Sequence, residues 1–238
     1  MIAVVSSTVA PSVLPSHDGK RTTLTPETRL DQTRATVASL VALGAKQIVI
    51  SDNSAGDWLR DRAAELHPAK VLHMDQPPVR NKGIGELWLL LGALDALEAG
   101  APILKISGRY TVGPKTELTQ GPEADVVGKA SGEGLAAEIS TRCYLLRDKA
   151  IAARLWGRAI DEIYAERSRI VGPRSLIRII RNSVRPRDDS FPYSDPNTLS
   201  LEQATQRAVR HLGLRFRAVA NMDVEGTLGS WTNPLIKE

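Results

Sequence analysis

The segment NKGIGELWLLLGALDALEAGAPILKISGRYTV, residues 81–112, contains the pattern that decides the fold. It opens with a glycine turn and continues as a long apolar helix that Gly100 ends. A short apolar strand follows at residues 103–106, and then a polar turn at residues 107–110. A helix leading into a short buried strand is typical of a parallel sheet that helices cover on both faces.

The same alternation runs from the first residue to this segment. Strands are predicted in 2–6, 46–54, 70–76 and 102–108, and helices in 25–45, 57–67 and 81–100. After residue 112 the pattern becomes mixed, with two strands in 124–130 and 138–147, helices in 150–166, 174–187 and 200–213, and a last strand in 214–226. We therefore predict an α/β sandwich with a mostly parallel sheet and a mixed C-terminal half. The predicted halves of this one domain are 1–112, which binds the ligand, and 113–238, which binds an acceptor.

Composition supports a globular protein. The chain has 238 residues, of which 42% are hydrophobic and 24% charged, and this balance argues against disorder. The lone Cys143 excludes an intrachain disulfide framework and a cysteine-based zinc site, and it fits a reducing compartment. The N-terminus lacks a basic region, and no stretch approaches the roughly 18 apolar residues of a membrane span. We expect a cytoplasmic protein.

Charge is distributed unevenly along the chain. Residues 142–187 contain 12 Arg or Lys and 4 Asp or Glu, a local charge of +8, so the remainder carries −4 of the net +4. A basic block suggests a polyanionic neighbour. Within it, residues 174–187 form a basic amphipathic pattern. This helix could contact an anionic membrane surface, although a helix packed on the core with a solvated basic face is the favoured interpretation.

Polar side chains follow each predicted strand of the first half, and ligands of parallel sheets bind at the edge where the carboxyl ends of the strands meet. A helix start with nearby cations suits phosphate, and a guanidinium can bind a diphosphate through two bonds. An Asp at this edge can accept from a ribose hydroxyl or a base N–H. The predicted binding residues are Ser6, Ser7, Thr8, Asp52, Asn53, Asn81, Lys82, Gly83, Lys105, Ser107, Gly108, Arg109 and Tyr110.

Several of these residues also have a structural interpretation. Asp52 could instead close an Asx turn. Lys82 and Gly83 could belong to a plain turn, and Arg109 to a surface ion pair that contributes little. Lys105 is harder to dismiss, because an unpaired lysine buried in an apolar strand is costly.

Acidic residues of the second half are candidates for acid–base chemistry. Glu202 opens a predicted helix, where the helix dipole already favours an acid. Asp189 lies in the proline-rich loop before it. The four histidines show no metal-ligand spacing.

Several of these segments together resemble the nucleotide-sugar glycosyltransferases of the GT-A type, in particular the family-2-like enzymes of polysaccharide biosynthesis. The resemblance rests on SDNS at 51–54, RNKGIGE at 80–86 and the helix, glycine and strand of 199–226. It implies a Rossmann-type GT-A fold, a nucleotide contact by Asp52 and a general base at Glu202. In those enzymes the strand that corresponds to residues 103–106 ends in an Asp-x-Asp that binds the metal and the diphosphate. This chain has Ser-Gly-Arg there, at residues 107–109.

The resemblance implies a glycosyltransferase that moves a sugar from a nucleotide-sugar donor to a glycan or lipid-linked acceptor. Because a cation can replace a cation, Lys105 and Arg109 are predicted to neutralise the leaving diphosphate without a metal. No cofactor is then expected, with Mg²⁺ or Mn²⁺ as the alternative. Glu202, or failing that Asp189, would deprotonate the acceptor.

Two other functions stay open on the sequence alone. A sugar-phosphate nucleotidyltransferase has a related fold, but the glycine-rich signature that follows its first strand is missing from residues 6–21. The basic block could also bind nucleic acid. Aromatic residues for base stacking are few, with 2 Phe and 4 Tyr, and we expect no nucleic-acid partner.

Overall fold

The computed structural model describes residues 1–11, 24–75, 82–119, 123–133, 137–168, 173, 177, 199–227 and 235–238. Asn81 and the loop with Asp189 fall outside these residues. So does the predicted helix at 174–187, apart from Ile177, which is helical and exposed. No helix in the part of the chain that is described is long and apolar enough to cross a membrane.

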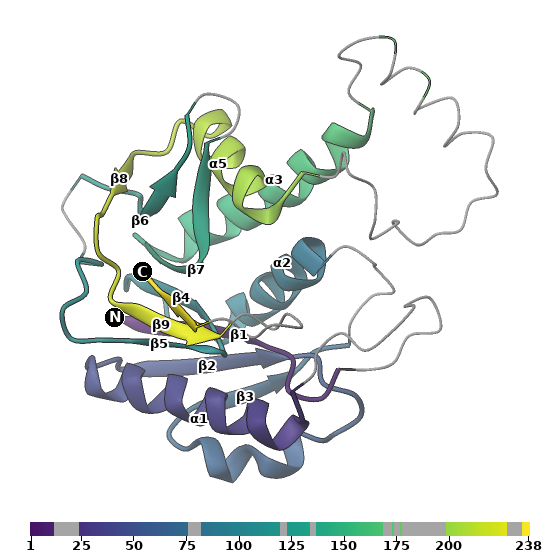
Figure 1. Cartoon of the computed structure of the whole chain (residues 1–238), viewed down its shortest axis with the longest axis vertical. Helices are drawn as coiled ribbons and strands as arrows, with labels where there is room; N and C mark the ends of the chain where they lie inside the picture. The colour runs from purple at the N-terminus through teal and green to yellow at the C-terminus, as the bar shows by residue number, and fades with distance from the viewer. Residues whose placement is uncertain are drawn as a thin grey trace.

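A seven-stranded sheet with the order β3-β2-β1-β4-β7-β6-β8 forms the centre of the molecule (Figure 1). The four strands of the first half pair in parallel, and they are β1 (Ile2–Ser7), β2 (Gln47–Asp52), β3 (Lys70–His73) and β4 (Ile103–Ser107). The strands of the second half are β6 (Val126–Ser131), β7 (Glu138–Leu146) and β8 (Phe216–Ala218). β7 runs antiparallel to both β4 and β6, while β8 is parallel to β6. The predicted α/β class with a mostly parallel sheet is confirmed.

Helices cover both faces of this sheet. One face packs against α1 (Pro26–Ala42) and the 3₁₀ helix η1 (Arg60–Leu66). The other face packs against α2 (Lys82–Ala93), α3 (Lys149–Ser168) and α5 (Leu201–His211), and a short 3₁₀ turn, η2 (Leu94–Ala96), extends α2. Alternate residues of each strand point to the two faces, which is why the buried strands read as continuous apolar runs.

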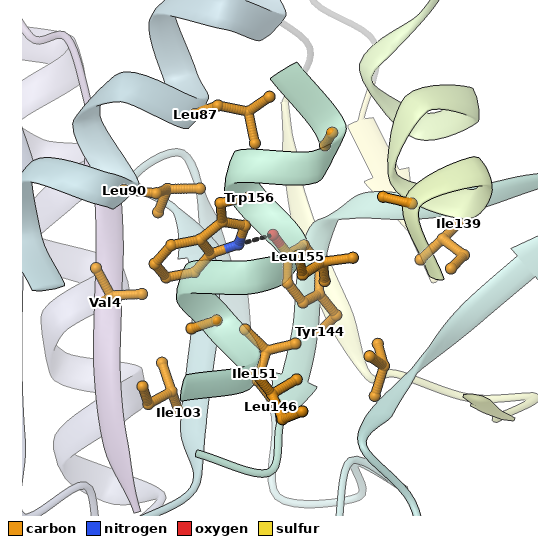
Figure 2. Packing of buried hydrophobic residues seen from close by; sticks show 14 of the residues in the cluster. Val4, Leu87, Leu90, Ile103, Ile139, Tyr144, Leu146, Ile151, Leu155 and Trp156 are labelled. Carbon is orange, nitrogen blue, oxygen red and sulfur yellow. Dashed lines mark hydrogen bonds between the residues drawn. The ribbon is translucent and has the colours of Figure 1, made fainter. Parts of the chain in front are cut away.

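Trp156 of α3 is the largest side chain buried in the second face (Figure 2). Its indole N–H donates to the hydroxyl of Tyr144 on β7 at 2.8 Å, so neither polar group is left unpaired in the core. Burial raises the pKa of the Tyr144 phenol, which therefore stays neutral. This bond joins α3 to the strand that pairs with β4.

Two expectations from the sequence were wrong in detail. The helix predicted at 57–67 is the 3₁₀ helix η1. The single strand predicted at 214–226 is two strands, because the backbone turns at Asp223, whose φ is +48°. The Glu117 carboxylate accepts from the N–H groups of Ala220 and Asn221 and holds this turn.

The second of these strands belongs to another sheet. After the turn, β9 (Val224–Thr227) lies between β5 (Tyr110–Val112) and β10 (Leu235–Lys237) in a three-stranded sheet. Both of its pairings are antiparallel. This small sheet lies beside α1 and continues directly from the polar turn after β4.

Candidate functional site

A pocket lies where β1 and β4 end, at the carboxyl edge of the parallel strands. The adjacent α1 and α2 both begin at this edge (Figure 1). The described residues that line the pocket are Ser6, Ser7, Thr8, Val9, Pro11, Arg29, Thr33, Asn53, Lys82, Gly85, Glu86, Leu89, Ser107, Gly108 and Arg109. Eight of them were predicted from the sequence, and the structure brings those eight together around one cavity.

The loop after β1 forms one wall and is held by the end of β2. The buried Asp52 carboxylate accepts from the backbone N–H of Val9 at 3.2 Å and of Ser54 at 2.8 Å. The Thr8 hydroxyl donates to the Asn53 side chain at 2.5 Å. Asp52 therefore closes the Asx turn that was its alternative interpretation, and it does not line the pocket. Its observed contacts position the loop.

Gly108 allows the turn that presents Arg109 to approach its neighbours closely. Its N–H donates to the Ser6 carbonyl at 2.9 Å, and its own carbonyl accepts from the Thr33 hydroxyl at 3.1 Å. A Cβ at this position would lie 3.3 Å from Thr33 Oγ1 and 3.3 Å from a methyl of Val5, closer than most side chains tolerate. Hydrogen bonds from β1 and α1 thus fix the backbone directly before Arg109.

Arg29, which was not predicted, faces the same cavity from the start of α1. Burial and the positive charge of Arg109 lower the pKa of Arg29 from 12.5 to about 10, against a smaller opposite effect of Asp52. Arg29 stays protonated at neutral pH, so two guanidinium groups meet in one pocket. Neither forms an ion pair with a carboxylate among the described residues. The sequence held a usable signal, because a helix that follows a parallel strand begins at the carboxyl edge of the sheet.

Glu86 of α2 was also missed, and it explains the buried lysine. Lys105 Nζ lies 2.5 Å from Glu86 Oε1, which also accepts from the Ser6 hydroxyl at 2.9 Å. The Lys105 ammonium donates as well to the carbonyl of Thr141 on β7 and lies 5.6 Å from the Tyr144 ring. Lys105 is fully buried behind Glu86 and does not line the pocket. This position corrects the prediction that Lys105 and Arg109 face the diphosphate together.

The pair determines the charge of Glu86. Burial alone would raise the pKa of this carboxyl, but the Lys105 charge and the bonds from Lys105 and Ser6 outweigh burial, and the pKa lies below its ordinary value of 4.5. Glu86 is therefore ionised at neutral pH.

Acid should remove the contribution of the Glu86–Lys105 pair to the stability of the fold. Because the folded-state pKa is lowered, the pair stabilises the fold above pH 4.5, and that contribution is lost as the pH falls through the folded-state pKa. We expect the free energy of unfolding to fall more between about pH 6 and about pH 3 in the wild type than in Glu86→Gln. Urea denaturation at both pH values measures the difference. Glu98→Gln, an exposed matched control, should behave as the wild type, and equal slopes in all three proteins would contradict the assignment.

The other predicted residues lie at the rim of the pocket, in the core or outside the pocket lining. Lys82 begins α2 and is exposed at the rim of the pocket, and Gly83 follows it without lining the cavity. Tyr110 is buried in the core on β5. Glu202 lies in the first turn of α5, outside the lining, where it accepts from the Thr141 hydroxyl at 2.7 Å.

The lining does not suit the metal that the GT-A resemblance implies. Mg²⁺ and Mn²⁺ prefer several oxygen ligands, usually with more than one carboxylate. Glu86 is the single carboxylate among the described lining residues, and it is already paired with Lys105. Elsewhere in the described part of the chain no three His, Cys, Asp or Glu side chains group to hold a metal ion. We therefore derive no step through a metal.

Comparison with known proteins gives no family. No family model matches the chain, and no curated protein does. Similar solved structures include a nucleoside-diphosphate-sugar pyrophosphorylase from Vibrio cholerae RC9, with 12% identity, a TM-score of 0.47 and coverage of 98% of this chain and 97% of that chain. The 4-diphosphocytidyl-2C-methyl-D-erythritol synthase from Anaerococcus prevotii DSM 20548 has 11% identity and a TM-score of 0.48, with coverage of 100% and 92%. The galactosyltransferase LgtC in complex with donor and acceptor sugar analogs has 9% identity and a TM-score of 0.48, with coverage of 94% and 86%. Scores this low do not assign an activity.

Proposed function

We propose that this protein is a glycosyltransferase whose pocket binds the diphosphate of a nucleotide-sugar donor. The observation that carries the proposal is the meeting of Arg29 and Arg109 in one cavity without a described acidic partner. Two like charges in a partly buried site are unfavourable unless an anion joins them. Guanidinium groups bind phosphate through paired hydrogen bonds, and two of them suit a diphosphate.

The surroundings of the arginines support the same ligand. Lys82 adds a third cation at the start of α2, where the helix dipole also favours a phosphate. Ser6, Ser7 and Thr8 also line the pocket. In a transfer reaction the arginines would neutralise charge on the leaving diphosphate, the role that the sequence had given to Lys105 and Arg109. The proposal thus replaces Lys105 with Arg29.

On the acceptor side, the proposal keeps Glu202 and Asp189 as candidate bases. Glu202 is held by the Thr141 hydroxyl, and Asp189 lies outside the described residues. Glu86 is a poor base despite its position in the pocket, because its lowered pKa opposes proton uptake.

A nucleotidyltransferase is the second candidate, and one observation favours it. Five lining residues come from the end of β1 and the segment directly after it, namely Ser6, Ser7, Thr8, Val9 and Pro11. Nucleotidyltransferases also bind their nucleotide through the segment after the first strand, although their glycine-rich signature is missing from residues 6–21 here. Such an enzyme would use the same arginines on the phosphates of a nucleoside triphosphate.

Nucleic-acid binding is less well supported by the described part of the basic block. Arg142 is paired with Glu238, Arg147 with Asp125, and Arg158 with Glu162 at 2.7 Å. These cations are therefore partly neutralised by carboxylates, two of which lie outside the basic block and one within it.

The test is a thermal-shift panel of nucleoside diphosphates and nucleotide sugars, each with EDTA and with Mn²⁺. We expect one nucleotide series to raise the melting temperature in EDTA. A second assay separates the two enzymes, since a glycosyltransferase releases a nucleoside diphosphate from a nucleotide sugar and a nucleotidyltransferase releases pyrophosphate from a nucleoside triphosphate. Pyrophosphate release would favour the second candidate. Absence of any nucleotide-induced shift would overturn both.

A further inference from the structure

The lining of the pocket carries charges of both signs. Arg29 and Arg109 reach it from α1 and from the turn after β4, whereas Glu86 reaches it from the second turn of α2. A phosphate is attracted to the arginines and repelled by the carboxylate. The arrangement therefore orients a bound phosphate ester, with the anion toward the arginines.

One oxygen of Glu86 is used within the protein and the other is not. Lys105 and the Ser6 hydroxyl both bond to Oε1. Among the described residues Oε2 has no hydrogen-bond partner, and the Glu86 side chain is 27% exposed to solvent. Oε2 is thus the oxygen of Glu86 that remains available to a ligand.

The buried lysine fixes what that oxygen can bind. Because Lys105 lowers the pKa of Glu86, the carboxylate is ionised and can only accept hydrogen bonds. Its position is also fixed, since Oε1 is anchored by two donors from different strands, Lys105 on β4 and Ser6 on β1. The matching ligand group must be a donor, and a neutral hydroxyl is the donor that a sugar ester of phosphate carries next to its phosphate.

We propose that Glu86 Oε2 accepts a hydrogen bond from a sugar hydroxyl of the ligand whose phosphate lies on Arg29 and Arg109. The inference rests on the proposed function and adds a specificity determinant to it. The pocket would distinguish a sugar ester of diphosphate from inorganic pyrophosphate. The hydroxyl can come from the ribose of the nucleotide or from the sugar to be transferred, which share this chemistry.

Calorimetric titration can test the assignment with four classes of probe. They are inorganic pyrophosphate, the ribonucleoside diphosphates UDP, GDP, CDP and ADP, their 2′,3′-dideoxy counterparts, and the corresponding glucose and mannose nucleotides. Proteins to be compared are the wild type, Glu86→Gln, the charge-balanced double variant Lys105→Met/Glu86→Gln, and the exposed control Glu98→Gln. The double variant keeps the test valid if Glu86→Gln folds poorly because Lys105 has lost its counter-ion.

A hydrogen bond to a charged acceptor corresponds to a loss of roughly tenfold to 100-fold in affinity when it is removed. We expect such a loss for the bound nucleotide in Glu86→Gln and in the double variant, with pyrophosphate binding undiminished in both and Glu98→Gln unchanged. If the ribose supplies the hydroxyl, the wild type discriminates against the dideoxy nucleotide and the variants do not. If the transferred sugar supplies it, the variants lose only the extra affinity for the nucleotide sugar.

Unchanged nucleotide and nucleotide-sugar affinity in both Glu86 variants would overturn the inference and leave the proposed function standing. Binding of pyrophosphate without binding of any nucleotide would overturn the inference and the proposed function together.

Discussion

Replacing Arg109 with glutamine is expected to weaken binding of a nucleoside diphosphate by about 100-fold, and the double variant Arg29→Gln/Arg109→Gln should abolish measurable binding. A guanidinium–phosphate bond is charge-assisted and in this pocket is partly shielded from water, so its loss corresponds to roughly 10-fold to 100-fold in affinity for each arginine. Calorimetric titration in EDTA measures both variants.

The stability of the unliganded protein should not fall in the Arg109→Gln variant, although its affinity for the nucleotide does. Arg29 and Arg109 repel one another, which is part of why the pKa of Arg29 is lowered to about 10. Removing one of them relieves this repulsion, so the unliganded Arg109→Gln protein should unfold at an equal or higher urea concentration than the wild type. A variant that lost binding because its fold was damaged would show the reverse.

The exposed Arg154 on α3 offers a matched control, since Arg154→Gln removes the same charge at a residue that does not line the pocket. It should bind the nucleotide as the wild type does. Full affinity in Arg109→Gln, or an equal loss in Arg154→Gln, would contradict the anion site.

Replacing Lys105 with methionine is expected to cost about 3 kcal/mol of folding free energy, because it leaves the Glu86 charge without its counter-ion and removes the lysine donor of the Thr141 carbonyl. The estimate takes the lower end of the range for buried pairs, since the Glu86 side chain is 27% exposed and water solvates it in part. Urea denaturation at neutral pH measures the loss.

The companion variant Lys105→Met/Glu86→Gln should recover most of this loss, because a neutral amide facing a methionine leaves no uncompensated charge. Glu86→Gln alone should be destabilised, since it strands the buried ammonium. The four proteins form a double-mutant cycle that isolates the interaction of the two side chains. Additive effects in that cycle would show that the pair is not coupled.

Much of the scaffold could be predicted from the sequence because strand and helix periods are local signals. The parallel order of the first half follows from alternating apolar runs, and Gly108 and Arg109 were placed at the pocket because polar residues after buried strands meet at one edge. Asp52 was predicted to bind the ligand, but it does not line the pocket. A carboxylate at this position can accept hydrogen bonds from the loop backbone as readily as from a ligand, and the sequence does not distinguish the two.

Other features depend on tertiary contacts that no single segment encodes. Glu86 lies within an apolar helical run, and its importance appears only when β4 brings Lys105 beneath it. Arg29 lies in a helix whose composition resembles that of an ordinary surface helix. Its role in the pocket follows only from the position of the helix N-terminus at the carboxyl edge of the sheet. The division of the last strand depends on Glu117, about a hundred residues away, which binds the turn.

Lys105 also connects parts of the chain that the sequence divides. Its ammonium joins Glu86 in the first half to the Thr141 carbonyl on β7, and the hydroxyl of Thr141 joins Glu202 on α5. β4 and β7 are paired along the same stretch, with Lys105 opposite Tyr144. Unfolding either half would therefore leave a buried charge and an open sheet edge in the other, so the two halves should melt together as one cooperative unit.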